Sequence, residues 1–253
     1  MKQIAIITGA TAGIGRATAE LLAGNDFDVI ITGRRLEKLD LLEEQIRSKT
    51  EADVLSLAFD IRDQAAVNEA CEQLSGKWEN VDVLVNNAGL AAGLSHIHEG
   101  SVVDWEQMID TNIKGLLYIT RVISPGMVKR QKGHIINIGS IAGKESYEKG
   151  NVYNATKFAV DGLTQGMRID LIDHGIKVTS IDPGAVETEF SLVRFKWDSE
   201  MADQVYDGYT PLYAEDIAEA ILFAVTRPPH VNIDDMLIMP TAQARSRKFN
   251  RKN

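Results

Sequence analysis

The sequence predicts an α/β fold of the Rossmann type, a doubly wound parallel sheet of about seven strands with helices on both faces. Three observations support this fold class. Short runs rich in Ile, Val and Leu show little polar alternation, as expected for strands covered on both faces. Amphipathic stretches separate these runs, and a glycine-rich turn follows the first run.

The apolar runs define the expected strands. They are KQIAIIT (2–8), DVIITG (28–33), DVLSLAF (53–59), VDVLVNN (81–87), GHIINIGS (133–140), IKVTSID (176–182) and DMLIM (235–239). Each run is short, and together the runs are dense in Ile, Val and Leu with little polar alternation, which suits buried strands.

The amphipathic stretches define the expected helices, over residues 13–24, 36–49, 64–76, 101–131, 153–175 and 214–226. Several of them end in glycine or in Lys and Arg, as helix C-termini do. A β-α-β series of this length implies parallel strands with right-handed crossovers. Ligands of such sheets bind beyond the carboxyl ends of the strands, and the motifs described below all lie there.

Composition limits the class of protein. The chain has 253 residues, so a single domain over residues 1–253 is expected. Its net charge of −9 argues against nucleic acid or an anionic membrane as the main partner. Cys71 is the single cysteine, so no intramolecular disulfide can form, and its helical context predicts a buried thiol.

Several further expectations concern location and metals. A strand beginning at residue 2 leaves no room for a signal peptide, and no apolar run reaches about 18 residues, so we expect a cytoplasmic protein. The basic tail after Met239 is expected to be loose. No metal site is expected, because the five histidines are scattered: His96, His98, His134, His174 and His230.

The glycine-rich turn predicts nucleotide binding. Its glycines follow the spacing G-x-x-x-G-x-G between a strand and a helix, which permits a tight turn, while the helix N-terminal amides face a pyrophosphate. The alternative is a strand–helix turn that needs glycine for its conformation alone. The residues expected to contact the nucleotide are Gly9, Thr11, Ala12, Gly13, Ile14 and Gly15.

The end of the second strand indicates which dinucleotide binds. Sites for a free ribose 2′-hydroxyl usually have an acid there, but this chain has Arg34 and Arg35. Guanidinium groups suit a 2′-phosphate in charge and geometry, so NADP(H) is favoured over NAD(H). The alternative is that both arginines are solvated residues in the first turn of the next helix.

Tyr153 and Lys157 are candidates for acid–base chemistry. Residues four apart share one face of a helix, so the ammonium group can lie near the phenol. A nearby positive charge is expected to lower the pKa of the phenol from its ordinary value of about 10. Tyr147 has Asn151 four residues later, and is expected to be a pocket wall or core residue.

Four motifs together resemble the short-chain dehydrogenase/reductase family: TGATAGIG, VNNAG, Ser140 and the Tyr153–Lys157 pair. The resemblance extends from Lys2 to Met239. It implies that Tyr153 is the acid/base, that Lys157 lowers its pKa and holds the nicotinamide ribose, and that Ser140 orients the substrate carbonyl or hydroxyl. It also implies that Asn112 steadies a proton-relay water.

The resemblance implies further cofactor contacts. Asp60 and Ile61 are expected beside the adenine, and Asn87, Ala88 and Gly89 near its ribose, with Pro183, Gly184, Val186 and Thr188 over the nicotinamide and its phosphates. Ala12 departs from the family, because some NADP-dependent members have a basic residue there. Local alternatives remain for three residues: Ser140 as a strand-end cap, Asn112 as a helix cap or turn residue, and Asp60 as the cap of the helix near Asp63.

Within the family, the chain resembles a branch that oxidises 3-hydroxy acids with NADP, usually as a homotetramer. Residues 187–213 are expected to form a substrate lid, and Arg194 within it could bind a carboxylate or be a surface arginine. One rival is a general ketone or 3-oxoacyl thioester reductase, and another is a non-catalytic sensor of NADP(H). Apolar positions on the helices after Asn112 and Tyr153 could form interfaces or intramolecular core.

Overall fold

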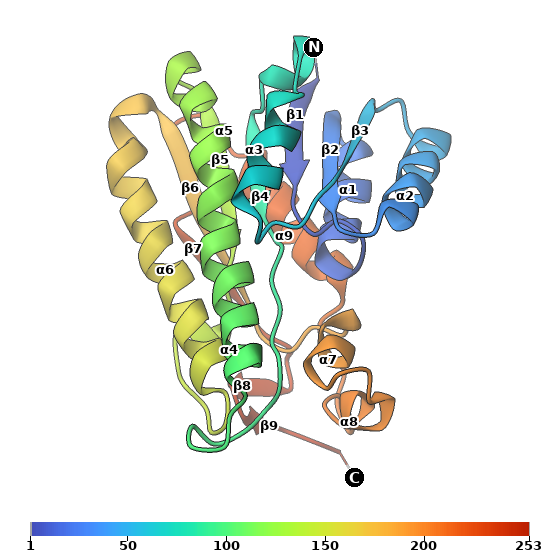
Figure 1. Ribbon diagram of the computed structural model, residues 1–253, viewed down its shortest axis with the longest axis vertical. Helices are drawn as coiled ribbons and strands as arrows, with labels where there is room; N and C mark the ends of the chain where they lie inside the picture. Colours follow the sequence, from blue (N-terminus) through green and yellow to red (C-terminus); the bar gives the residue numbers. More distant parts are fainter. Residues whose placement is uncertain (1, 253) are drawn as a thin grey trace.

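A seven-stranded parallel sheet forms the centre of the protein, with strand order β3-β2-β1-β4-β5-β6-β7 (Figure 1). The computed structural model describes residues 2–252. The strands lie close to their expected positions: β1 (Gln3–Ile7), β2 (Phe27–Gly33), β3 (Val54–Ala58), β4 (Val83–Asn86), β5 (Gly133–Ile138), β6 (Ile176–Pro183) and β7 (Asp235–Ile238). The predicted doubly wound α/β fold is therefore confirmed.

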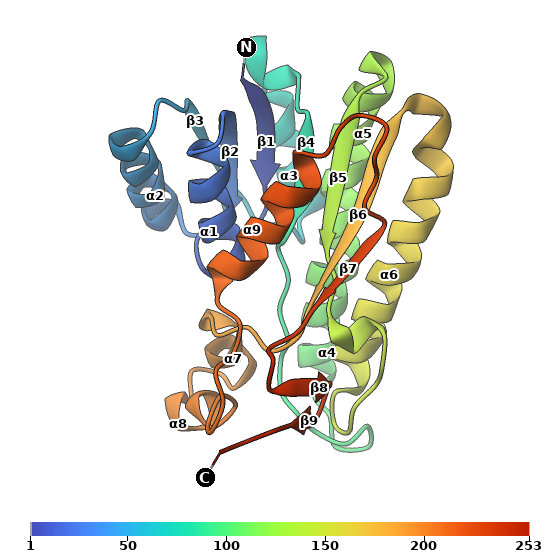
Figure 2. The same ribbon diagram turned by 180° about the vertical axis from the view of Figure 1, so that it is seen from behind.

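Helices cover both faces of the sheet, as Figure 1 and Figure 2 show from opposite sides. One face packs against α1 (Gly13–Ala23), α2 (Leu36–Lys49) and α9 (Ala214–Val225). The other packs against α3 (Gln64–Glu72), α5 (Leu116–Arg130) and α6 (Asn151–Leu171), with α4 (Val102–Ile109) beside α6. No helix within residues 2–252 is long and apolar enough to cross a membrane.

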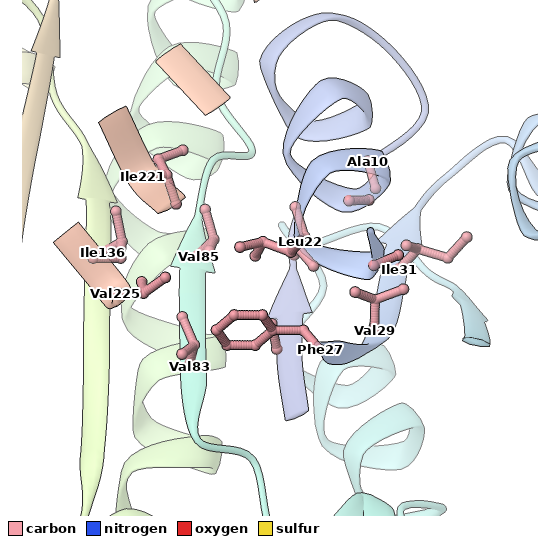
Figure 3. Packing of buried hydrophobic residues seen from close by; sticks show 14 of the residues in the cluster. Ala10, Leu22, Phe27, Val29, Ile31, Val83, Val85, Ile136, Ile221 and Val225 are labelled. Atoms are coloured by element: carbon pink, nitrogen blue, oxygen red, sulfur yellow. The ribbon is translucent and has the colours of Figure 1, made fainter. Parts of the chain in front are cut away.

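Strand alternation divides the core into two apolar layers. On β1, Ala5 and Ile7 face the α1 side, whereas Ile4 and Ile6 face the α5 side. Figure 3 shows the first layer, in which Leu22 of α1 packs among strand residues. Each fully buried side chain of this size contributes about 1.5–3 kcal/mol, so this burial fixes the strands and the loops that follow them. The prediction for Cys71 is confirmed: it is buried, and burial raises the pKa of its thiol to about 11.

The helix predicted over residues 101–131 is interrupted. It consists of α4, a π-helical segment η2 (Asp110–Gly115) and α5, so the expectation of one continuous helix is wrong. A π-helical turn adds a residue per turn and rotates the side chains that follow it. The two flanking helices bury their apolar side chains in different clusters, Met108 of α4 beside Tyr153 and Ile119 of α5 against the sheet.

The carboxyl edge of the sheet is covered by two segments distant in sequence. The first holds the short helices α7 (Glu189–Arg194) and α8 (Ser199–Asp203), and the second is a hairpin of β8 (Gln243–Arg245) and β9 (Lys248–Phe249) (Figure 2). The Gln243 side chain accepts a hydrogen bond from the Ala185 amide at 2.8 Å, and the Lys252 amide donates to the Gly208 carbonyl at 2.7 Å. The expectation of a loose tail is therefore wrong, because polar groups of the tail bond to residues between Ala185 and Gly208.

Candidate active site

A cavity of about 370 Å³ lies at the carboxyl ends of the strands, lined by the glycine turn, the strand ends and the lid segment. It brings together all the predicted site residues except Gly15, Asn112 and Arg194. Gly15 and Asn112 support the cavity wall from behind, and Arg194 lines a smaller neighbouring pocket that Tyr153 also borders. Residues from seven separate segments thus converge as the sequence predicted.

The glycine turn has the geometry of a phosphate-binding loop. Gly9 (φ 67°) and Gly13 (φ 51°) adopt left-handed conformations that favour glycine. A Cβ at Gly15 would lie 2.4 Å from the Gly9 carbonyl oxygen, so a larger residue there would force the turn open. The helix N-cap is Ala12, which offers no side-chain cap, and the first turn of α1 has no acid. These free amides and the absence of acid fit the pyrophosphate of a dinucleotide.

Asn87 and Thr8 hold the turn against β4. The Asn87 side chain donates to the carbonyl oxygens of Thr8 at 2.8 Å and Gly9 at 3.2 Å. In return, the Thr8 hydroxyl accepts from the amides of Asn87 and Ala88 at 3.0 and 2.9 Å. Asn87, which was expected near the adenine ribose, therefore stabilises the phosphate loop.

The basic end of the cavity contains Arg34 and Arg35, as expected for a 2′-phosphate. Arg35 donates to the Thr11 hydroxyl at 2.8 Å and pairs with Glu189 at 3.0 Å. Sequence reasoning missed Glu189, because only the fold brings the lid back to the end of β2. Both arginines line the cavity just before α2; Arg34 is exposed and Arg35 is half-buried, and their role toward a 2′-phosphate remains a prediction.

Asp60 lines the same end of the cavity and pairs with Arg62 at 2.6 Å. The Arg62 hydrogen bond lowers the pKa of the Asp60 carboxyl, although partial burial raises it. The alternative role for Asp60 as a helix cap is filled by Asp63, whose side chain accepts from the first amides of α3.

The catalytic candidates Tyr153 and Lys157 lie on one face of α6, as predicted. Both are buried against the cavity. The Lys157 ammonium lies 6.0 Å from the centroid of the Tyr153 ring and donates to the Ile138 carbonyl at 2.9 Å. The end of β5 therefore fixes the lysine beside the phenol.

The expected lowering of the Tyr153 pKa is wrong for this geometry. Burial raises the pKa of the phenol, as does Tyr147, and these effects exceed the lowering by Ser140 and Arg194. Burial also lowers the pKa of Lys157 to about 8, against an opposing effect of Asp182. The ammonium is itself desolvated and bonded to a carbonyl, which limits its effect on the phenol. Tyr153 is therefore protonated at neutral pH and can donate a proton.

Ser140 occupies the end of β5 opposite Tyr153. Its hydroxyl accepts from the Ala142 amide at 3.1 Å, so the local alternative of a cap is also fulfilled. Its own amide donates to the buried carboxylate of Asp182 at 3.0 Å. Asp182 was not singled out in the sequence, since nothing local distinguishes it from any strand-end acid.

Asn112 lies in the π-helical segment η2. Its carboxamide accepts from the Leu90 amide and donates to the Leu90 carbonyl, both at 2.8 Å, and also donates to the Thr156 hydroxyl at 3.0 Å. Asn112 therefore connects the loop after β4 with α6, one turn from Tyr153. Its expected role toward a water remains a prediction.

Arg194 extends from the lid toward the catalytic tyrosine. Its Cζ lies 5.5 Å from the centroid of the Tyr153 ring, and its Nη1 donates to the Tyr147 hydroxyl at 2.9 Å. Its Nη2 is buried without a hydrogen-bond partner in the described part of the chain. Tyr147 lines neither pocket. It packs, partly buried, against the cluster around Tyr153 and bonds to the arginine, and Phe190 packs edge-on against Tyr153 at 5.7 Å.

Within residues 2–252, no three His, Cys, Asp or Glu side chains are grouped so that they could hold a metal ion. His96 and His98, the closest pair in sequence, stack with their ring centroids 5.8 Å apart. Neither lines the cavity.

A buried tyrosine–lysine pair and a glycine turn that line one cavity of a doubly wound sheet are typical of a dehydrogenase. The family model for short chain dehydrogenase matches residues 3–199. The chain therefore belongs to the short chain dehydrogenase family.

Named relatives align over almost the whole chain. The NADP-dependent 3-hydroxy acid dehydrogenase YdfG of Salmonella typhi is 49% identical over 242 residues, which cover 95% of this chain and 96% of that protein. Sulfoacetaldehyde reductase 2 of Chromohalobacter salexigens is 42% identical over 245 residues, which cover 96% of each. The closed form of a serine dehydrogenase complexed with NADP+ matches with a TM-score of 0.93 and 44% identity, over 99% of this chain and 100% of that one.

Proposed function

We propose that this protein is an NADP-dependent dehydrogenase of 3-hydroxy acids such as serine, allo-threonine and 3-hydroxypropionate. The relatives named above support the reaction class and the cofactor. The observation that carries the substrate class is the buried, unpartnered Nη2 of Arg194 beside Tyr153. A carboxylate two bonds from the reacting carbon would satisfy that donor while the hydroxyl reaches the phenol.

Different cavity residues would bind the cofactor and the substrate. The glycine turn would hold the pyrophosphate, Arg34 and Arg35 the 2′-phosphate, and Lys157 the nicotinamide ribose. When bound, NADP supplies the hydride acceptor or donor. Ser140 would orient the substrate oxygen. The protonated Tyr153 would donate its proton to that oxygen in reduction, and in oxidation Tyr153 would accept the hydroxyl proton as the phenolate. Burial by Phe190 and Val193 of the lid excludes water from these groups.

An initial-rate panel tests the proposal. Rates with NADP+ and NAD+ are compared for L-serine, allo-threonine, 3-hydroxypropionate, isethionate and a neutral secondary alcohol. We expect the 3-hydroxy acids with NADP+ to give the highest kcat/KM. Activity on acyl thioesters alone would favour the 3-oxoacyl reductase, and inactivity with every alcohol would favour the NADP(H) sensor. Isethionate is included because a relative is named for sulfoacetaldehyde and a sulfonate carries the same charge.

Arg194→Ala tests the carboxylate anchor. Loss of a charged hydrogen bond in a partly buried site costs about 2–3 kcal/mol, so the KM for 3-hydroxy acids should rise about 30- to 160-fold. The KM for a neutral secondary alcohol should change little, and equal effects on both substrates would refute the assignment. Arg227→Ala is the matched control, because Arg227 lies beyond α9, where its carbonyl contacts Lys177 at the start of β6.

We further propose a cytoplasmic homotetramer. Apolar side chains remain exposed along α6 and at its end, where Phe158 is 43%, Ile169 75% and Ile172 69% exposed. Exposed apolar side chains on one helix suit a subunit interface. Light scattering of the purified protein measures the assembly, and a monomeric mass would contradict it.

A further inference from the structure

The lid is joined to the basic end of the cavity by an ion-pair cluster that the proposed reaction does not use. Glu189, the first residue of α7, accepts from Arg35 Nη1 at 3.0 Å through Oε2 and from Lys38 Nζ at 2.9 Å through Oε1. The three side chains are 34–39% exposed, which places the cluster at the rim of the cavity. The contacts connect residues more than 150 positions apart in the sequence.

Arg35 is held from its opposite side by the phosphate loop. Its Nε and Nη2 both donate to the Thr11 hydroxyl, at 3.3 and 2.8 Å. The remaining guanidinium nitrogen, Nη1, donates to Glu189. Arg34 also lines the cavity but forms no ion pair within residues 2–252. The two arginines therefore differ, because only Arg35 already has an anionic partner.

The residue before Glu189 rests directly on the glycine turn. A Cβ at Gly13 would lie 3.1 Å from the Thr188 side chain, so the start of the lid and the phosphate loop are in contact. Burial raises the pKa of Glu189, but hydrogen bonds from Lys38 and Arg35 lower it more, and the carboxylate is charged at neutral pH. A negative charge on the lid thus lies where the cofactor's phosphate would be bound.

We propose that Glu189 is an internal counter-ion that competes with the 2′-phosphate of NADP(H) for Arg35 and thereby ties the lid to the cofactor-binding site. The proposal rests on the proposed NADP site at Arg34 and Arg35. A 2′-phosphate has a charge of about −1.5 to −2 at neutral pH, and a carboxylate on the same guanidinium corner repels it. Binding of the phosphate to Arg35 displaces the Glu189 carboxylate from Nη1, while Lys38 can retain that carboxylate at the rim of the cavity. A cofactor with a free 2′-hydroxyl leaves the Arg35–Glu189 pair intact.

Equilibrium binding of 2′,5′-ADP and 5′-AMP tests the proposal without turnover. These two probes differ only in the 2′-phosphate, and their Kd values are measured by calorimetry on wild type and Glu189→Gln. The amide keeps the shape of the side chain and removes its charge. We expect Glu189→Gln to bind 2′,5′-ADP about three- to tenfold more tightly and 5′-AMP with an unchanged Kd. The gain should shrink in high salt, because the cluster is partly exposed.

Glu187→Gln is the matched control, because Glu187 is an exposed acid of the same segment without contact to Arg35. An unchanged Kd for 2′,5′-ADP in Glu189→Gln, or weaker binding, would overturn the competition; weaker binding would mean that Glu189 orients Arg35 for the phosphate. Wild type without preference for 2′,5′-ADP over 5′-AMP would instead refute the NADP site itself. A second readout is trypsin cleavage after Lys196, which should be faster in ligand-free Glu189→Gln than in Glu187→Gln.

Discussion

The catalytic floor and the lid lie on opposite sides of one cavity and are built differently. The floor, which comprises Asn112, Ser140, Tyr153 and Lys157, is buried, and three of its side chains bond to backbone groups: Asn112 to Leu90, Ser140 to Ala142 and Lys157 to Ile138. The lid, residues 187–213, has two short helices, and its Trp197 is 63% exposed in a left-handed turn (φ 71°). The groups proposed to move protons are thus fixed, whereas the groups proposed to select ligands lie on a more exposed segment.

The two regions also differ in how their charges are held. On the floor, burial sets the protonation of Tyr153 and Lys157. On the lid, Arg194 and Glu189 reach back to partners elsewhere in the chain, a tyrosine hydroxyl and two cations. Changes on the floor should therefore alter the reaction itself, and changes on the lid should alter binding.

Tyr153→Phe should give the largest effect. Removal of the only phenol hydroxyl that the proposed mechanism uses should reduce kcat by about 10³-fold or more. The Kd for 2′,5′-ADP should stay unchanged, since the ring still packs against Phe190. Tyr213→Phe, on an exposed tyrosine before α9, is the control and should keep full activity. Substantial activity in Tyr153→Phe would show that another group moves the proton.

His134→Gln tests how the buried imidazole of β5 affects stability at acidic pH. Burial, with a smaller effect of Lys177, lowers the pKa of His134 from 6.5 to about 3, and its Nε2 contacts the Thr179 hydroxyl at 2.8 Å. Because the unfolded chain binds this proton more readily, the contribution to stability is lost as pH falls from 6.5 toward 3. The free energy of unfolding should drop by about 2–3 kcal/mol between pH 7 and 4.5 through this group.

Urea denaturation of wild type and His134→Gln at pH 7 and 4.5 measures the contribution of His134 to the free energy of unfolding. Glutamine stays neutral, so His134→Gln should lose less stability on acidification than wild type. Equal losses in the two proteins would mean that His134 is protonated in the folded state without cost.

Tyr147→Phe should give the smallest effect and sharpen the role of the lid. The hydroxyl orients Arg194 through one hydrogen bond of 2.9 Å, worth about 1 kcal/mol. The KM for 3-hydroxy acids should rise about fivefold, with kcat nearly unchanged. A fall in kcat comparable to that of Tyr153→Phe would place Tyr147 among the proton-transferring groups.

Much of the fold and the floor could be predicted because their signals are local. Apolar runs located the strands, the spacing of Gly9, Gly13 and Gly15 located the phosphate loop, and helical periodicity placed Tyr153 beside Lys157. Each of these patterns extends over a few residues and depends on backbone geometry alone.

The remaining features depend on contacts that no local pattern contains. The partner of Arg35 is Glu189, and that of Tyr147 is Arg194, both distant in sequence. In the π-helical turn, the Asn112 carboxamide bonds to Leu90 and Thr156, which lie on two other segments of the chain. The raised pKa of Tyr153 was missed because the proximity of Lys157 could be read from the spacing, but the extent of burial could not.

The C-terminal hairpin has a practical consequence for work on this enzyme. Its Gln243 side chain, the Arg251 guanidinium and the Lys252 amide all bond to the polypeptide between Ala185 and Gly208. A purification tag fused after these residues could disturb the contacts that hold residues 185–208 over the cavity. Kinetic constants from proteins tagged at that end should therefore be compared with those of an untagged preparation before they are assigned to the native enzyme.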